Sequence, residues 1–349
     1  MEQQVAHLAI PGAAVAIVAD GKVAWRKSCG WANIAEQVPV SNDTPFGLGS
    51  ISKTFIAVAL MQAIEDGYLT LDTKINDVLP FAVHNPLVDG DAITMRHLVT
   101  HTSGIKDNIW TYNFMSYRTG DPQTELGQFL KDYLVPGGTR YKKRGNFIKA
   151  QPGIEYEYSN IASGLAAYVI EVATNQPFEK YTHQRIFEPL KMQNTAWFLK
   201  DFQAKTAVAM PYNRLGRPYG YLGIASWPDG QLRSSIIDLG RYLAAIMNDG
   251  ELEGTRILSR ESVRVLLSEP LPTLENEEGE AQFVFWGVEK KLIGHNGGDP
   301  GVFTLMYFDS EIHQGGIVLT NTLTRNSTRG SMIILQQLLR FGLSNSQAN

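Results

Sequence analysis

The stretch "FGLGSISKTF", residues 46–55, places Ser50 three residues before Lys53 and leads directly into a long apolar run. The run "ISKTFIAVALMQAIEDG" stays apolar over several helical turns and stops at Gly67, which is typical of a buried helix closed by a glycine. Residues three apart on a helix share a face, so the Lys53 amine can point at the Ser50 oxygen. If Ser50 opens the helix, its own N–H has no helical partner and faces outward.

The Ser50 and Lys53 pair fits two interpretations. A serine hydroxyl is a weak nucleophile at neutral pH, and a catalytic one needs a base within reach and donors for the oxyanion. The same spacing also fits a serine that only caps a helix beside a solvated lysine. Because a free lysine amine has a pKa of about 10.4, a basic Lys53 requires burial or a cationic neighbour. The catalytic interpretation therefore predicts further polar groups beside the pair.

The segment "EYEYSNIASG", residues 155–164, offers such groups just before a helix of small residues. The Tyr158 phenol can shuttle a proton, and the Asn160 amide can hold a substrate carbonyl and Lys53 together. Taken alone, Tyr158 fits a core tyrosine equally well.

The segment "GHNGGDPG", residues 294–301, lies between runs that favour β-strands. Two adjacent glycines allow a backbone to approach a ligand closely, so the N–H of Gly298 is a candidate second oxyanion donor. His295 would add a donor or a positive charge beside it, although a loop histidine is the simpler alternative.

The order and spacing of these three pieces resemble the serine β-lactamase and DD-peptidase superfamily. The similarity is greatest to its class C β-lactamase-like branch, which includes family VIII esterases and D-aminopeptidases. It covers nearly the whole chain, through the blocks "IPGAAVAIV", "FGLGSISKTF", "GYLTLDTKI", "ITMRHLVTHTSGI", "PGIEYEYSN", "GQLRSSIIDLGRYL" and "GHNGGDPG".

The resemblance implies a role for each matched residue. Ser50 would be the acyl-accepting nucleophile, Lys53 its activating partner and Tyr158 the proton relay to the leaving group. Asn160 would orient the substrate, and the amides of Ser50 and Gly298 would form the oxyanion hole.

One departure from the family pattern bears on substrate choice. Members that handle β-lactams usually carry lysine where His295 stands, and a histidine with an ordinary pKa of about 6.5 is largely neutral near pH 7. We therefore expect weak recognition of substrate carboxylates, which disfavours β-lactam hydrolysis and D-alanyl carboxypeptidase activity. Asn296 and Gly297 are expected to contact the substrate beside it.

Aromatic side chains are expected to form the substrate wall. They gather in residues 105–150 and 219–227, with more aromatic area than a solvent loop needs, although they can also pack the two halves of the protein together. Tyr221 and Trp227 are the predicted substrate contacts, and the full set is Trp110, Tyr112, Phe114, Tyr117, Tyr219, Tyr221 and Trp227.

The chain pattern predicts an α+β fold. A hairpin at Asp20-Gly21 opens the chain and short β-rich runs close it, whereas residues 70–200 favour helices without strand alternation. A helix with Ser235 and Asp238 in capping-box spacing precedes the closing strands. We expect a central antiparallel sheet flanked by helices (residues 1–66 and 201–349) and an inserted, mostly helical domain (67–200), with the active site in the cleft between them.

Composition limits the partners. The net charge is −4 over 349 residues, from 31 Lys and Arg against 35 Asp and Glu, so no global attraction draws the chain to nucleic acid. No apolar run reaches the roughly 18–20 residues of a membrane span. The N-terminus lacks a signal-peptide pattern, which leaves a cytoplasmic protein or an exported one with its signal removed. Oligomeric state is not readable.

No cofactor and no metal are expected. Cys29 is the single cysteine, which excludes an internal disulfide and a cysteine-based cluster. His97 and His101 have the i, i+4 spacing of metal ligands, but no third ligand accompanies them.

The sequence therefore predicts a metal-independent serine hydrolase that forms an acyl-enzyme on Ser50 and acts on esters, small amides or short peptides. An acyltransferase and a D-amino-acid-specific peptidase are the alternatives with the same site. A non-catalytic binding protein is the alternative of another class.

Overall fold

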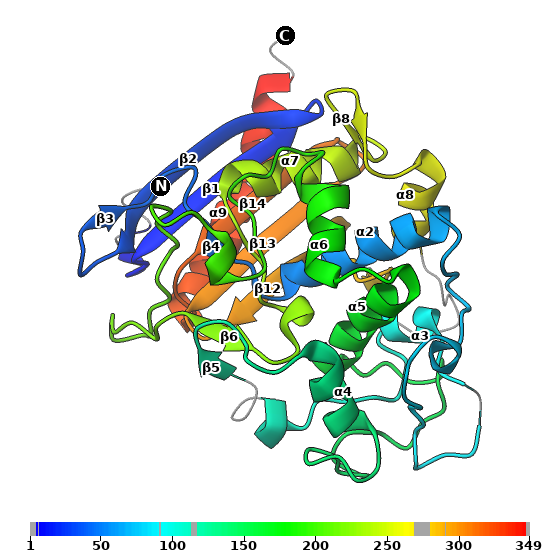
Figure 1. Cartoon of the computed structure of the whole chain (residues 1–349). Helices are drawn as coiled ribbons and strands as arrows, with labels where there is room; N and C mark the ends of the chain where they lie inside the picture. The colour runs from blue at the N-terminus through cyan, green and yellow to red at the C-terminus, as the bar shows by residue number, and fades with distance from the viewer. Residues whose placement is uncertain are drawn as a thin grey trace.

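The computed structural model describes residues 5, 7–90, 92–112, 117–268, 280–289 and 291–346. Within them the main feature is an eight-stranded antiparallel sheet of order β10-β11-β12-β13-β14-β1-β2-β3 (Figure 1). Its strands are β1 (Gly12–Ala19), β2 (Lys22–Asn33), β3 (Val38–Pro39), β10 (Glu280–Gln282), β11 (Gly287–Glu289), β12 (Leu292–Asp299), β13 (Val302–Asp309) and β14 (Gln314–Thr320). Because β1 pairs with β14, the sheet is assembled from both ends of the chain, as predicted.

The opening hairpin follows from its two turn residues. Asp20 and Gly21 have φ values of 51° and 67°, which the favoured two-residue hairpin turn requires at both positions. Residue Ala19 then pairs with Lys22 across the turn. The predicted hairpin is confirmed.

Helices cover both faces of the sheet. The outward residues of β1, Val15 and Ile17, pack against α9 (Arg325–Ser346), whereas alternate residues such as Ala14 and Ala16 face the main core. On that core face α7 (Ile236–Met247) lies against β1 and β2. One of the two hydrogen bonds of the predicted α7 capping box is found, since Ser235 Oγ accepts from Asp238 N.

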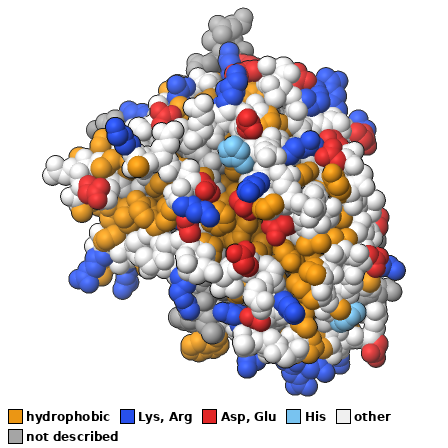
Figure 2. All heavy atoms as spheres, viewed as in Figure 1, with side chains coloured by type: hydrophobic (Ala, Val, Ile, Leu, Met, Phe, Trp, Pro, Cys, Tyr) orange, Lys and Arg blue, Asp and Glu red, His pale blue; other side chains and the backbone are white. Residues whose placement is uncertain are grey.

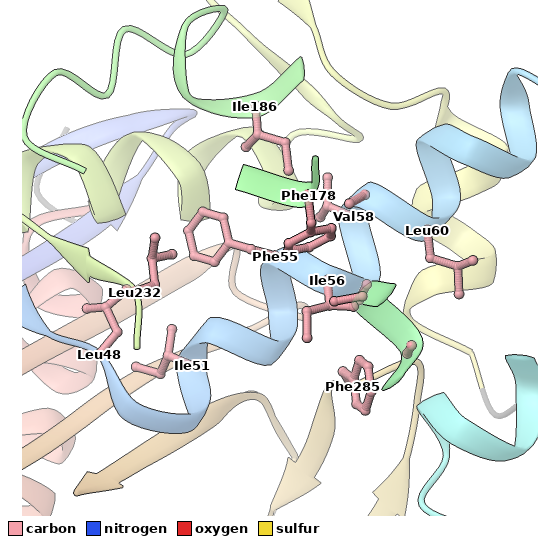
Figure 3. Close-up of a cluster of buried hydrophobic side chains, with 14 of the residues drawn as sticks. Leu48, Ile51, Phe55, Ile56, Val58, Leu60, Phe178, Ile186, Leu232 and Phe285 are labelled. Atoms are coloured by element: carbon pink, nitrogen blue, oxygen red, sulfur yellow. The ribbon is translucent and has the colours of Figure 1, made fainter. Parts of the chain in front are cut away.

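Helix α2 (Ser52–Glu65) crosses the middle of the molecule, and its first twelve residues are all buried. Side chains from α2, from the turn before it and from neighbouring elements form one apolar cluster (Figure 3). Phe55 stacks on Tyr242 of α7 with ring centroids 3.9 Å apart. The helix ends in a Schellman motif, since Gly67 N donates to Ile64 O and Tyr68 N donates to Ala63 O. The predicted glycine stop is confirmed.

The helical region lies on the far side of α2 from the sheet (Figure 1). Helix α5 (Asn160–Thr174) packs against α2, α3 (Met95–Val99), α4 (Leu126–Leu134) and α6 (Phe178–Thr182). One correction concerns this region, because residues 70–200 contain a strand, β5 (Tyr117–Thr119), which pairs with β6 (Leu222–Ile224). One buried cluster spans the sheet and these helices, so the division at residues 66/67 and 200/201 remains a prediction.

Short elements complete the fold. Strand β4 (Phe46–Gly47) pairs with β7 (Arg233–Ser234) just before the Ser50 turn, and β8 (Glu251–Leu252), β9 (Thr255–Arg256) and α8 (Arg260–Leu266) follow α7. No described helix has the length and apolar character needed to span a bilayer.

Candidate active site

Ser50 lies in a 3-10 turn, Gly49–Ile51, that runs directly into α2. Lys53 is in the first turn of that helix, and its side chain is completely buried. Its Nζ lies 3.0 Å from Ser50 Oγ. The alternative of a solvated lysine is therefore wrong, and the two side chains meet as the spacing predicts.

The partners of Lys53 fix what its amine can do. Nζ lies 2.7 Å from Asn160 Oδ1 and 2.7 Å from Asp229 O, and both oxygens can only accept hydrogen bonds. The Ser50 hydroxyl is the one neighbour of the three that can also donate. A proton can therefore pass between Nζ and the Ser50 hydroxyl, whereas the two carbonyl oxygens only hold the amine in place.

Tyr158 reaches Ser50 from the loop before α5. Its hydroxyl donates to Ser50 Oγ at 2.8 Å, and Lys53 Nζ lies 5.0 Å from the centre of its ring. The His101 ring packs against the Tyr158 ring at 4.3 Å between centroids. His101 has a φ of 57°, and its Nδ1 accepts a hydrogen bond from Ser159 N. Tyr158 is thus held beside Ser50 by packing on His101, and the bond from Ser159 N fixes the His101 ring in turn.

His97 and His101 do not face a common point. His97 Nδ1 accepts from Thr94 N in the α3 capping box, whereas His101 lies against Tyr158. Burial lowers the pKa of His101 well below its ordinary value. Within the described ranges, no group of three or more metal-ligating side chains comes together.

Asp107 is a site residue that the sequence analysis missed. Its Oδ2 accepts from Asn160 Nδ2 at 2.8 Å and from Asn160 N at 3.0 Å, while Oδ1 accepts from Ser159 Oγ and Ile161 N. Because Asp107 accepts from the Asn160 amide nitrogen, the Asn160 oxygen must point toward Lys53. No local pattern marks this aspartate, since its partners are about fifty residues away.

The turn that carries Ser50 lies close to Gly298, whose N–H is the second expected oxyanion donor, because the contact is made by glycine. Gly49 has a φ of 55°, and a Cβ on it would lie 2.8 Å from Gly298 N. A Cβ on Gly297 would overlap Leu48 O, and Thr304 Oγ1 donates to that same oxygen at 2.7 Å. The turn that carries Ser50 therefore rests directly on β12. Strand β11 pairs with β12 only as far as Gly294, so this part of β12 has no β11 partner.

His295 lies near Lys53 and loses its charge at a lower pH than its ordinary pKa of about 6.5 suggests. Burial, with the Lys53 charge as the second cause, lowers the pKa of His295 to about 4. Its Nδ1 bonds to Asn296 O, and since a carbonyl only accepts, Nδ1 carries the proton and Nε2 is an acceptor. The expected change of charge near pH 6.5 is corrected to a lower pH.

Two other predicted contacts on β12 have different surroundings. Side chains alternate along a strand, so Asn296 lies on the opposite face from His295 and Gly297, beside Tyr307. The expectation that Asn296 contacts substrate is corrected for this reason. Gly297 provides close packing against Leu48.

Asp229 and Asp299 are two further acids that the sequence analysis missed. Burial raises the pKa of Asp229 to about 7 and that of Asp299 to about 6. Asp229 is fully buried and accepts from Tyr112 OH at 3.0 Å and from Ser226 Oγ. Asp299 accepts from Tyr117 OH at 2.6 Å. Asp299 ends β12 and Asp229 ends a 3-10 turn, Trp227–Asp229, and their position at the site becomes evident only in three dimensions.

The aromatic residues of the predicted substrate wall lie in different surroundings, and the role of those at the cavity remains a prediction. Tyr112, Tyr117 and Tyr219 line a cavity of about 380 Å³ that opens on Ser50. Tyr221 lines a smaller adjoining cavity, and its hydroxyl donates to Val208 O. Trp227 is buried against Trp197, Phe198 and Phe178, so its predicted role in substrate contact is corrected to a core role. Trp110 is exposed, and Phe114 lies outside the described residues.

Ser50 Oγ thus lies within hydrogen-bond distance of Lys53 Nζ and Tyr158 OH, beside a cavity that Ser50 lines, and this geometry is compatible with acyl transfer through serine. A family model described as beta-lactamase matches residues 1–340. The chain belongs to the beta-lactamase family. Members of this superfamily are typically serine hydrolases, and its penicillin-binding protein homologues share the present fold.

Beta-lactamase family relatives match most of this chain. Protein flp of Staphylococcus aureus (strain NCTC 8325 / PS 47) is 24% identical over 319 residues, which is 89% of this chain and 60% of flp. The chain thus spans about 60% of the length of the first curated relatives that it matches.

Solved structures show the same fold. The octameric penicillin-binding protein homologue from Pyrococcus abyssi superposes with a TM-score of 0.75 at 25% identity, over 97% of this chain and 75% of that one. The penicillin binding protein from Bacillus halodurans also gives a TM-score of 0.75, at 21% identity over 96% of this chain and 98% of that one. The predicted fold and superfamily are confirmed.

Proposed function

We propose that this beta-lactamase family member is a metal-independent serine hydrolase that forms an acyl-enzyme on Ser50. Its substrates are esters, small amides or short peptides. The observation that carries the proposal is the position of Ser50 Oγ, 3.0 Å from Lys53 Nζ and 2.8 Å from Tyr158 OH.

In the first step, Ser50 Oγ bonds to the substrate carbonyl carbon while its proton passes to the Lys53 lone pair. The carbonyl oxygen becomes negatively charged and takes hydrogen bonds from Ser50 N and Gly298 N. The bond from carbon to the leaving group then breaks, and Tyr158 supplies the leaving group with a proton that Lys53 restores. Water repeats the same steps on the acyl-enzyme and releases the acid.

The neutral His295 supports esters and amides over carboxylated β-lactams. A permanent cation at that position would attract a substrate carboxylate, and a histidine with a pKa of about 4 carries no such charge at pH 7. Release of the acyl group to an amine or alcohol in place of water would use the same contacts, and product analysis with added nucleophiles separates the two outcomes.

An active-site serine probe tests the proposal. A fluorophosphonate should add one label per chain, and peptide mass mapping should place it on Ser50. Ser50→Ala should lose the label and all turnover while keeping its circular dichroism, and Ser268→Ala, which changes an exposed serine, serves as the control. Absence of label on Ser50 in the folded wild type would favour the non-catalytic binding protein.

A further inference from the structure

The cavity that opens on Ser50 is lined by residues other than the group proposed to protonate the leaving group. It is lined by Ser50, Asn160 and Gly298, whereas Tyr158 and His295 are not among its described lining residues. If Tyr158 protonates the leaving group, that group departs toward Tyr158. The cavity on the other side is then the place of the acyl group, an assignment that rests on the proposed function.

Asp299 supplies a carboxylate to this acyl cavity. Tyr117 OH donates to Oδ1, and Oδ2 lies beside Gly230, where an added Cβ would be 3.4 Å from it. Among the described residues no donor is hydrogen-bonded to Oδ2, so this oxygen is available to a bound group. Asp229, by contrast, is fully buried and has both carboxylate oxygens occupied by Tyr112 and Ser226.

The nearby cations are committed to other partners. Lys53 donates to Ser50, Asn160 and the Asp229 carbonyl, and Arg233 donates to backbone carbonyls, including Leu222 O at 2.9 Å. Among the described residues, no Lys, Arg or His forms an ion pair with Asp299. The negative charge of Asp299 thus faces the cavity without a bound counter-ion.

Tyrosine rings form much of the rest of the wall. Tyr112 and Tyr117 meet edge to face with centroids 6.0 Å apart, and Tyr219 stands at the exposed rim. Ring faces attract ammonium groups and repel carboxylates. In Figure 2 hydrophobic side chains form a band across the middle of one face, with acidic and basic side chains among them.

We propose that this cavity selects acyl groups that carry a positively charged amine, with the ammonium bound by Asp299 and flanked by the rings of Tyr112 and Tyr117. Asp299 is then the residue that determines specificity, and Tyr117 orients its carboxylate. The substrates are esters or amides of amino acids, or peptides with a free amine near the scissile carbonyl.

Matched phenyl esters test the charge preference directly. Phenyl esters of glycine, 3-aminopropanoic acid and 5-aminopentanoic acid are each compared with the alkyl ester that has methyl in place of ammonium. The readout is the ratio of kcat/KM for the cationic and neutral members at pH 7, or the ratio of Ser50 acylation rates by intact mass where turnover is slow. We expect a ratio of about tenfold or more for at least one chain length, because a hydrogen bond to a charged group contributes that much.

Asp299→Asn keeps the shape of the side chain and removes its charge. We expect this variant to reduce the ratio about tenfold, and Tyr117→Phe to reduce it less. The control is Glu261→Gln, an exposed acid on α8, which should leave the ratio within about twofold of wild type.

A wild-type ratio at or below one for every chain length overturns this inference even if the variants fold poorly. An unchanged ratio in a folded Asp299→Asn does the same. In both cases neutral esters still acylate Ser50, so the proposed function stands. Failure of Ser50 to react with any ester or with the fluorophosphonate overturns the proposed function itself.

Discussion

The two sides of Ser50 differ in how their polar atoms are satisfied. Around Lys53 every contact is internal, since Nζ meets Ser50, Asn160 and Asp229, and Asp107 fixes the Asn160 amide. Across the cavity, Tyr117 holds one oxygen of Asp299, and no other residue that the structure describes is hydrogen-bonded to the second oxygen. The first region is complete before a substrate arrives, whereas the second is completed by the substrate. Changes near Lys53 should therefore slow all substrates alike, and changes near Asp299 should reorder them.

The largest effect is expected when the internal contacts are removed. Lys53→Ala and Tyr158→Phe should each slow acylation by about 10²–10⁴-fold, because each removes a positioned proton-transfer group. Stopped-flow or mass-based acylation rates on three unrelated esters measure this, with the exposed Lys191→Ala as the control. A fall on one ester but not on the others would contradict the division between the two sides.

Asp107→Asn should have the next largest effect. It removes the charged acceptor that orients Asn160, and we expect acylation to slow roughly 10–100-fold with little change in substrate affinity. A double-mutant cycle with Asn160→Ala separates orientation from stability. If Asp107 acts through Asn160, its replacement has little further effect in the Asn160→Ala background. Additive losses would mean that Asp107 only holds the start of α5.

His295→Lys adds a permanent positive charge where the wild type is neutral. We expect kcat/KM for a carboxylated ester to rise roughly twofold to tenfold relative to its neutral partner, without faster turnover of the neutral ester. The pH dependence is measured in Asp299→Asn, because the cavity carboxyl of the wild type has a pKa of about 6 and would itself change the ratio in this range. Burial lowers the pKa of His295 to about 4, so the ratio in this variant should stay flat between pH 5.5 and about 8, and a ratio that falls through pH 6.5 would show that the imidazolium does bind carboxylates.

The smallest effect concerns stability. Burial raises the pKa of Asp299 from 3.8 to about 6, so the folded protein keeps a proton that the unfolded chain has already lost. The wild type therefore loses stability from this group as pH rises from about 4 through 6. Asparagine does not titrate, so the Tm of Asp299→Asn minus that of wild type should become more positive between pH 4.5 and 7.5. Thermal unfolding across pH measures it, and a difference that shrinks would contradict the raised pKa.

The two sides also differ in how well the sequence predicts them. The meeting of Ser50, Lys53 and Tyr158 follows from one helical turn and from motif segments of recognisable spacing. The sheet could be predicted too, because the Asp20-Gly21 turn and the alternation in β1 are local signals.

The cavity side of Ser50 could not be predicted in the same way. Asp299 and Asp229 on this side bond to tyrosines 182 and 117 residues away, and no local period marks them. Asp107, on the Lys53 side, was missed for the same reason, because Asn160 is 53 residues away. Trp227 shows the converse error, since aromatic content alone does not distinguish a cavity wall from a core. The pKa of His295 depends on burial and on the Lys53 charge, and neither can be read from its neighbours in sequence.

The contact between the Ser50 turn and β12 has a consequence for the order of folding. Thr304 holds Leu48 O across 256 residues, and Asn321 Oδ1 accepts from Gly12 N across 309. Contacts this distant in sequence close late and slowly, because a long loop must first be ordered. Ser50 and Lys53 lie near the start of the chain and can come together early. Gly298, the proposed second oxyanion donor, reaches Ser50 only after β12 to β14 are synthesised and paired. During synthesis the proposed nucleophile, Ser50, is thus present long before Gly298, whose N–H would complete its oxyanion hole.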